Sequence, residues 1–246
     1  MEIFVNFYKK QLFLKRTILF LFLLVFLQCE AKQHVISLGP NCSPAMSLNY
    51  HKIRKEAYPF DWVVCSFDAM FKLLQTDFEN YLLPENLILK PQAPFFVFDI
   101  YTNVQYNHDF PISNVDDKLY EDQWKDAGGV GVVVSNFLDY LPDVYAKYLR
   151  RINRLGEVLN STEDNVIFVH YGITKNQAVL LRDFFESHYP HLNFIILAVN
   201  GAQEFSKNKW SENKIHDYCI TDMGWDMSAP GYYNVFKDIG LISKEE

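Results

Sequence analysis

The chain has 246 residues, of which 49% are hydrophobic and 16% aromatic, so it can bury a large core within one domain with elaborations. Its formal net charge of −7 argues against a nucleic-acid-binding protein, because phosphates attract Lys/Arg patches. Glycine and proline are scarce at 10 each, and no period or low-complexity tract appears, which argues against a repeat architecture.

The N-terminus has the order of an export signal. Four Lys/Arg side chains occur within residues 1–16, an unbroken apolar run follows from Ile18 to Leu27, and small Ala31 ends the segment. We expect residues 1–31 to be a signal peptide cleaved after Ala31, which makes the protein secreted or exported. An uncleaved membrane anchor and a lipoprotein lipidated at Cys29 remain open. Residues 32–246 are then a single domain, which meets the membrane only through that segment.

A strand, a turn and a helix are predicted between residues 35 and 53. The apolar pair Val35-Ile36 leads into Gly39-Pro40, and Cys42 precedes Ser43-Pro44, a pair typical of a helix start. A helix N-terminus favours a thiolate over a thiol and offers N–H groups to an oxyanion, so Cys42 is a candidate nucleophile. The ordinary alternative is a small buried cysteine without chemistry.

The middle of the chain predicts a helix and a hairpin. Large apolar residues recur at helical spacing from Ser66 to Leu82, and this stripe is expected to be core. Residues 87–89 form a short strand candidate. Residues 95–101 and 104–110 are dense in β-formers around Thr102-Asn103, which predicts a β-hairpin with His108 at the end of its second strand. Residues 128–131 are expected to form a loop.

The C-terminal half predicts a βαβ unit. A long amphipathic helix covers 142–159, with Lys147, Arg150 and Arg151 on a solvated face that also explains Arg154. A strand at 165–171, a helix at 174–188 and a strand at 192–199 follow, so the two strands are expected to be parallel neighbours. A further strand at 215–220 and a short helix near 233–236 complete an α/β (or α+β) fold. His170 is expected to be a hydrogen-bonded core or rim histidine.

Cysteine and histidine spacing gives no metal site. After removal of the signal, Cys42, Cys65 and Cys219 remain; a Cys65–Cys219 disulfide could form and leave Cys42 free. No Cys/His spacing fits zinc, so neither a metal nor another cofactor is expected.

The residues of the first blocks resemble a known family. The string Ser37-Leu38-Gly39-Pro40-Asn41-Cys42, the block Pro59-Phe60-Asp61-Trp62, the string His108-Asp109-Phe110 and the helix segment 148–154 are similar to the uncharacterised family called putative papain-like cysteine peptidases. The similarity covers roughly residues 34–200. It implies a papain-like core, in which a Cys-bearing helix packs on a small sheet, with Cys42 as nucleophile and His108 as general base.

A third residue should orient the imidazole. Asp61 is the first candidate, because it lies in the most specific block, and an anchor for the loop after the Cys42 helix is its equal alternative. Asp109 is expected to point to the opposite face of the strand from His108. Open candidates are Asp116, Asp117 and Asp226. Asn41 and Trp62 are assigned to substrate binding, with Trp62 as a wall of the site.

The function that follows is an exported thiol hydrolase. An amide or ester bond in a peptide, protein or cell-wall substrate would be cleaved through an acyl-enzyme at Cys42. Two alternatives stay open: an inactive papain-like binding module, and a glycan-processing α/β enzyme that would need a carboxylate pair or metal site such as Asp222 with Asp226.

Overall fold

The computed structural model describes residues 31–113, 119–120, 131–207, 209–221 and 230–243. The chain divides into two units, Met1–Lys32 and Gln33–Glu246, and the second carries all the elements described below. The expected signal peptide and Cys29 lie outside the described residues, of which Ala31 is the first. None of the helices in the described ranges combines the length and the hydropathy of a membrane span.

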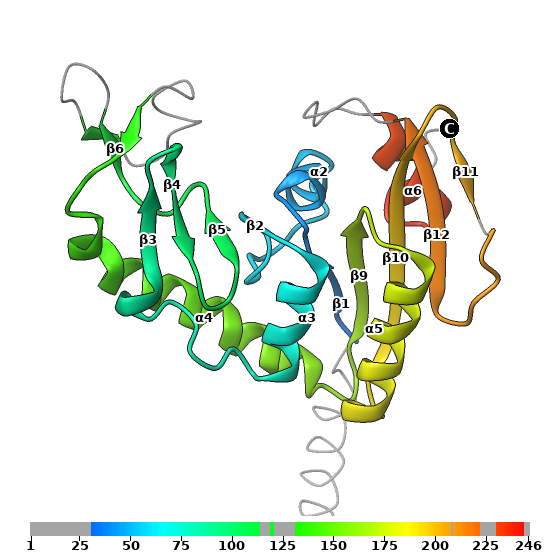
Figure 1. The fold of residues 1–246 in the computed structure, drawn as a ribbon. Coiled ribbons are helices and arrows are strands. Elements are labelled where there is room, and N and C mark those ends of the chain that lie inside the picture. Colours follow the sequence, from blue (N-terminus) through cyan, green and yellow to red (C-terminus); the bar gives the residue numbers. More distant parts are fainter. Residues whose placement is uncertain (1–30, 114–118, 121–130, 208, 222–229, 244–246) are drawn as a thin grey trace, which may run out of the picture. The chain divides into compact units, whose positions relative to one another are not determined.

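The second unit combines helices and strands, with the strands β3 to β8 following one another between α3 and α4 (Figure 1). The helices are α2 (Ser43–Tyr50), α3 (Phe67–Gln75), α4 (Leu141–Leu159), α5 (Lys175–His188) and α6 (Pro230–Asp238), with short 3-10 turns at Pro84–Asn86 and Phe137–Tyr140. The strands are β1 (Gln33–Ser37), β2 (Val63–Cys65), β3 (Leu87–Lys90), β4 (Ala93–Asp99), β5 (Val104–Tyr106), β6 (Ile112–Ser113), β7 (Leu119–Tyr120), β8 (Val132–Val133), β9 (Asn165–Tyr171), β10 (Asn193–Ala202), β11 (Ser206–Lys207) and β12 (Ile215–Thr221).

The central sheet has the strand order β1-β9-β10-β12-β11. The pairs β1–β9, β9–β10 and β10–β12 are parallel, and only β11 runs antiparallel to its neighbour. The predicted βαβ unit is therefore confirmed as β9-α5-β10. Parallel strands with crossover helices are the signature of an α/β fold, so the predicted fold class is correct and consistent with a papain-like domain.

Side chains alternate between the two faces of this sheet, as the pleat requires. Ile36, Phe168 and Ile196 belong to the core that includes α3, α4 and α5. Their neighbours in sequence, such as Val35 and Ile167, belong to a second core with α2 and α6. Buried on both faces, these strands read as nearly continuous apolar runs, which explains why the sequence predicted them well.

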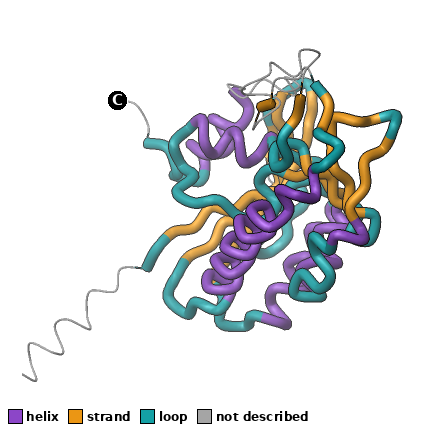
Figure 2. The backbone as a smooth tube through the Cα atoms, turned by 90° about the vertical axis from the view of Figure 1, so that its left-hand side faces the viewer, coloured by secondary structure: helices purple, strands orange, loops and turns teal. Residues whose placement is uncertain are grey.

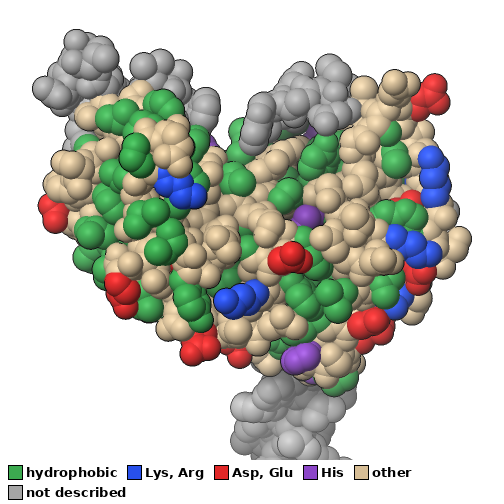
Figure 3. Space-filling view, viewed as in Figure 1, with side chains coloured by type: hydrophobic (Ala, Val, Ile, Leu, Met, Phe, Trp, Pro, Cys, Tyr) green, Lys and Arg blue, Asp and Glu red, His purple; other side chains and the backbone are tan. Residues whose placement is uncertain are grey.

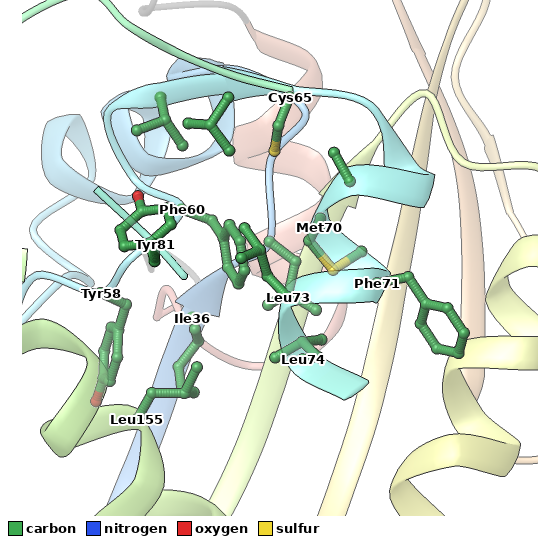
Figure 4. Close-up of a cluster of buried hydrophobic side chains, with 14 of the residues drawn as sticks. Ile36, Tyr58, Phe60, Cys65, Met70, Phe71, Leu73, Leu74, Tyr81 and Leu155 are labelled. Atoms are coloured by element: carbon green, nitrogen blue, oxygen red, sulfur yellow. The ribbon is translucent and has the colours of Figure 1, made fainter. Parts of the chain in front are cut away.

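A second, antiparallel sheet of order β2-β5-β4-β3 packs on α4. Tyr148 of α4 lies against Tyr106 of β5, with ring centroids 5.6 Å apart. Figure 1 shows α4 running below β3, β4 and β5, and in Figure 2 the same long helix crosses the foreground. Figure 4 shows the adjoining part of the core, to which Tyr58, Phe60, Cys65 and Met70 contribute side chains from different segments.

Two elements differ from the sequence prediction. The helix expected over 66–82 ends at Gln75, because Asp77, Phe78, Asn80 and Leu82 adopt left-handed backbone conformations that no helix continues. Its apolar residues are nevertheless core. The predicted hairpin exists as β4 and β5, but β5 ends at Tyr106, so His108 follows the strand in a bend. Of the loop expected at 128–131, only Gly131 lies within the described residues.

Candidate active site

The loop that leads to Cys42 is pinned to two strands. The Leu38 N–H donates to the Val169 carbonyl (2.8 Å), and the Tyr171 N–H donates to the Gly39 carbonyl (3.0 Å). From the other side, the Cys65 N–H donates to the Pro40 carbonyl (2.9 Å). Gly39 has φ +91°, a conformation that L side chains rarely adopt. The loop is thus fixed between β9 and the end of β2.

Cys42 is the N-cap residue of α2, as the sequence predicted, but its chemistry differs from the expectation. Its side chain is only 5% exposed. Of the first helical N–H groups, that of Ser43 donates to Asn41 Oδ1 (2.9 Å), and Pro44 has none. Burial raises the pKa of the Cys42 thiol, and its own backbone N–H only partly opposes this. The resting residue is therefore a thiol that needs a base to become a nucleophile.

Asn41 and Trp62, the two predicted substrate-binding residues, have different surroundings. The Asn41 side chain is engaged in the turn before α2 through its bond to Ser43. The Trp62 ring packs edge-on against the His108 ring, with centroids 5.8 Å apart, and the Arg54 guanidinium lies over the indole at 5.0 Å. The Trp62 indole therefore contacts both the His108 ring and the Arg54 guanidinium.

Asp61 is buried and bonded within its own segment. Its carboxylate accepts from the Tyr58 N–H (2.8 Å) and from Arg54 Nε (3.1 Å), and the residue is 1% exposed. Burial raises its pKa to about 6, while Arg54 and the Tyr58 N–H act in the opposite direction. Among the described residues these bonds are those of a loop anchor. They connect Asp61 to His108 indirectly, through Arg54 and then the Trp62 ring.

Asp109 follows His108 and is anchored to α4. It accepts from the Tyr148 hydroxyl (2.8 Å) and from Lys147 Nζ (2.6 Å), and its side chain is 2% exposed. Because both carboxylate oxygens are occupied, Asp109 ties the bend that carries His108 to the long helix. The sequence placed its side chain away from His108 but did not predict this partner.

The basic residues of α4 are only partly on a solvated face, contrary to the expectation from the sequence. Arg150 is exposed as predicted, but Lys147 pairs with Asp109, and Arg154 donates to the Ala57 carbonyl (2.6 Å) and pairs with Glu56 (3.0 Å). Arg151 lies over the Tyr148 ring at 5.0 Å. These side chains border the apolar face at spacings of three and four residues. From that border position a long side chain can either reach solvent or lie over apolar surface, so the sequence gives no signal that separates the two.

These contacts form one continuous set, which we call the His108 cluster. Its members are Arg54, Asp61, Trp62, His108, Asp109, Tyr148 and Arg151. The two ends of the set also interact, because the positive charge of Arg151 lowers the pKa of Asp61 as well as that of Tyr148. Cys42 is connected to the cluster through β2, which begins after Trp62 and ends at the bond between Cys65 and Pro40.

His170 differs from the hydrogen-bonded histidine that the sequence predicted. It is 1% exposed on β9, and in the described part of the chain neither ring nitrogen has a partner that meets hydrogen-bond geometry. Its ring lies 5.9 Å from that of Phe67. Burial lowers the pKa of His170 to about 4, and the nearby backbone of Tyr171 only partly opposes the shift. The imidazole is therefore neutral at physiological pH.

The remaining expectations concern thiols, carboxylates and charge. Cys42, Cys65 and Cys219 are free thiols, so the possible Cys65–Cys219 disulfide does not form. The described ranges contain no group of three His, Cys, Asp or Glu side chains that could hold a metal ion. On the face drawn in Figure 3, charges of both signs are scattered over the coloured surface. Asp116, Asp117, Asp222 and Asp226 lie outside the described residues.

Comparisons with known proteins identify the same family that the motifs around Cys42 and Asp61 resemble. Neither the curated proteins nor the solved structures gave a match to the chain. A family model described as putative papain-like cysteine peptidase matches residues 33–204, well over half of the chain and a span that includes Cys42 and the whole His108 cluster. The chain therefore belongs to the putative papain-like cysteine peptidase family.

Proposed function

We propose that the protein is an exported thiol hydrolase that cleaves an amide or ester bond through an acyl-enzyme at Cys42. Its substrate is a peptide, a protein or a cell-wall crosslink, and it reaches that substrate outside the cytoplasm after cleavage of residues 1–31. The observation that carries the proposal is the position of Cys42. It lies at the start of a helix, after a loop bonded to both β9 and β2, in a chain of the putative papain-like cysteine peptidase family.

His108 is the general base of this mechanism. Because burial raises the pKa of the Cys42 thiol, the proton must leave during the reaction, and a neutral imidazole accepts it. The sulfur then attacks the carbonyl carbon and forms a thioester, while His108 returns the proton to the departing amine or alcohol. A water molecule, deprotonated by His108, releases the acid and restores the thiol.

The other predicted residues support this step. Trp62 packs against the His108 ring and limits its orientation. Asp61 acts through Arg54, which it holds by a 3.1 Å hydrogen bond against the Trp62 indole. Asn41 shapes the turn that presents Cys42 and Ser43.

Acyl-enzyme trapping tests the proposal. The full-length protein is incubated with a panel of peptide amides and p-nitrophenyl esters, quenched in acid, digested and examined by mass spectrometry. We expect an acyl adduct on the peptide that contains Cys42, lost in Cys42→Ala and His108→Ala. Cys219→Ser, which changes a free thiol of intermediate exposure on β12, is the control and should acylate normally. Adducts that persist in Cys42→Ala, or none with any substrate, would refute the proposal.

A binding module without chemistry is the second candidate, and one observation favours it. The Cys42 side chain is nearly inaccessible and its thiol is protonated at rest, as in a structural cysteine. In that case, no ester or amide in the panel would turn over, although the protein would still bind one of the peptides.

A further inference from the structure

Two arginines of the His108 cluster have unused hydrogen-bond donors. The Arg54 guanidinium uses Nε for Asp61, and its terminal amino groups have no acceptor in the described part of the chain. Arg151 donates to none of the described residues, and its Nη1 is buried. A guanidinium presents five N–H donors, and buried donors without partners are rare in native proteins. The buried Nη1 of Arg151 therefore requires an acceptor that the described residues do not supply, and the terminal amino groups of Arg54 are free to bind the same acceptor.

The charges of the cluster do not balance either. Lys147 is paired with Asp109, and Arg154 is paired with Glu56. Arg54 and Arg151, in contrast, both act on the single carboxylate of Asp61, whose burial also opposes its ionisation. Among the described residues, one positive charge is therefore left without a carboxylate of its own, next to the indole that packs on His108. Such a surplus at a partly accessible place attracts an anion.

We propose that Arg54 and Arg151 bind a carboxylate group of the ligand beside Trp62 and His108. A carboxylate supplies two oxygens in one plane, which match the fork of donors on a guanidinium. Arg54 is suited to this, because its bond to Asp61 and its contact with Trp62 fix the plane of its side chain. The inference rests on the proposed function only in that the ligand is the substrate, and its binding can be measured without turnover.

The carboxylate can come from two parts of a peptide. A free C-terminus would make the protein select chain ends, and an Asp or Glu side chain would make it select internal acidic positions. Two matched pairs of probes separate these sources: acetyl-Ala-Ala-Ala acid against its amide, and acetyl-Ala-Glu-Ala-amide against acetyl-Ala-Gln-Ala-amide. Within each pair, only one charge and its hydrogen bonds differ.

Isothermal titration calorimetry of the full-length Cys42→Ser protein with these probes tests the inference. We expect the acidic member of at least one pair to bind about tenfold or more tightly than its neutral partner, because hydrogen bonds to charged groups are the stronger ones. Raised salt should reduce the difference. Equal affinity within both pairs, or no binding of any probe, would overturn the inference.

Variants on one helix assign the effect to Arg151. Arg151→Met should reduce the preference for the acidic probe to within about twofold, and Arg151→Lys, which keeps the charge but loses the fork, should leave an intermediate preference. Arg150→Met is the matched control, since Arg150 is the exposed neighbour on α4, and it should keep the full preference. An equal loss in Arg150→Met, or an unchanged preference in both Arg151 variants, would contradict the assignment.

The outcomes also separate the two proposals. A preference for the acidic probe without any acyl adduct on Cys42 would support the carboxylate site and refute the hydrolase. Acylation of Cys42 with equal affinity for acidic and neutral probes would do the reverse.

Discussion

The hydroxyl of Tyr148 donates a 2.8 Å hydrogen bond to the carboxylate of Asp109, and so joins the middle of α4 to the residue after His108. Tyr148 is fully buried, and its ring packs against those of Tyr81 and Tyr106. The bend that carries His108 is therefore held by a rigid helix and an aromatic core. This contact helps to set where the predicted general base lies.

Tyr148→Phe should destabilise the protein by about 1–3 kcal/mol, because it leaves the Asp109 carboxylate with one donor fewer in a buried place. Urea unfolding monitored by circular dichroism measures the change. The matched control is Tyr145→Phe on the same helix, where the side chain is 46% exposed and the change should cost less than about 0.5 kcal/mol. A similar loss in both variants would mean that the Asp109 bond contributes little.

Asp61→Asn should remove a pH dependence of stability. The folded-state pKa of Asp61 is raised to about 6, above its ordinary value of 3.8, so the folded protein binds the proton more tightly. Relative to a residue with an unshifted pKa, protonated Asp61 adds about 3 kcal/mol to the free energy of unfolding below pH 4, and this contribution is lost as the pH rises through 6. Urea unfolding at steps from pH 4 to 7.5 should show this fall in the wild type relative to Asp61→Asn. A constant difference between the two would contradict the raised pKa.

His170→Leu should remove a dependence of the opposite sign. The folded-state pKa of His170 is lowered to about 4 from 6.5, so protonation favours the unfolded chain. Stability from the neutral imidazole is complete above pH 6.5 and falls by about 3 kcal/mol as the pH drops to 4. The same titration should show that His170→Leu resists acid better than the wild type. The exposed His191→Gln is the control, and should behave as the wild type.

Together these two groups predict a compensated profile. Between pH 4 and 6.5 the Asp61 and His170 contributions to the free energy of unfolding change in opposite directions, so these two groups should leave the stability of the wild type nearly constant. Each single variant should show the pH dependence of the group that remains. The double variant should again be nearly flat. If the slopes of the single variants have the same sign, one of the two assignments is wrong.

Thiol labelling should follow burial in the resting protein. Burial raises the pKa of Cys42 and raises that of Cys65 to about 12, so both thiols are protonated at pH 7. Iodoacetamide labelling at pH 7, read by mass spectrometry, should be slow at Cys42, slower still at Cys65, and unchanged at Cys42 in His108→Ala. The urea-unfolded chain is the reference. Rapid labelling of Cys42 at pH 6 that depends on His108 would instead indicate a resting thiolate–imidazolium pair.

The elements with strong local signals could be predicted from the sequence. The helix from Leu141 to Leu159 has an apolar face with the right period, and α5 begins with a capping box in which Thr174 and Gln177 bond each other's backbone. The α3 helix was predicted too long, because the residues after Gln75 that adopt left-handed backbone conformations include no glycine or proline, the residues that usually indicate the end of a helix. Their conformations depend on packing that is distant in sequence.

The site could be predicted only in part. Cys42, Asp61 and His108 were chosen from motifs, and the structure gives Cys42 the helix start that its sequence indicated. The partners of Asp109 could not be derived, because they depend on the packing of α4 against a segment some forty residues earlier in the chain. Arg151 lies over the ring of Tyr148 on the same helix, whereas its sequence pattern predicted a place on the solvated face. A charged side chain beside an apolar helix face has the same sequence pattern whether it meets solvent or a buried phenol.

The contacts made by α4 also set the alignment of two loops. Tyr148 and Lys147 hold the Asp109 bend, and Arg154, two turns further on, holds the carbonyl of Ala57 ahead of Asp61. Each helical residue turns the side-chain direction by about 100°. One residue inserted between Tyr148 and Arg154 would therefore rotate one anchor away while the other stayed bound. The number of residues in this helix segment, and not only their identity, therefore keeps the Asp61 and His108 loops in their positions relative to each other.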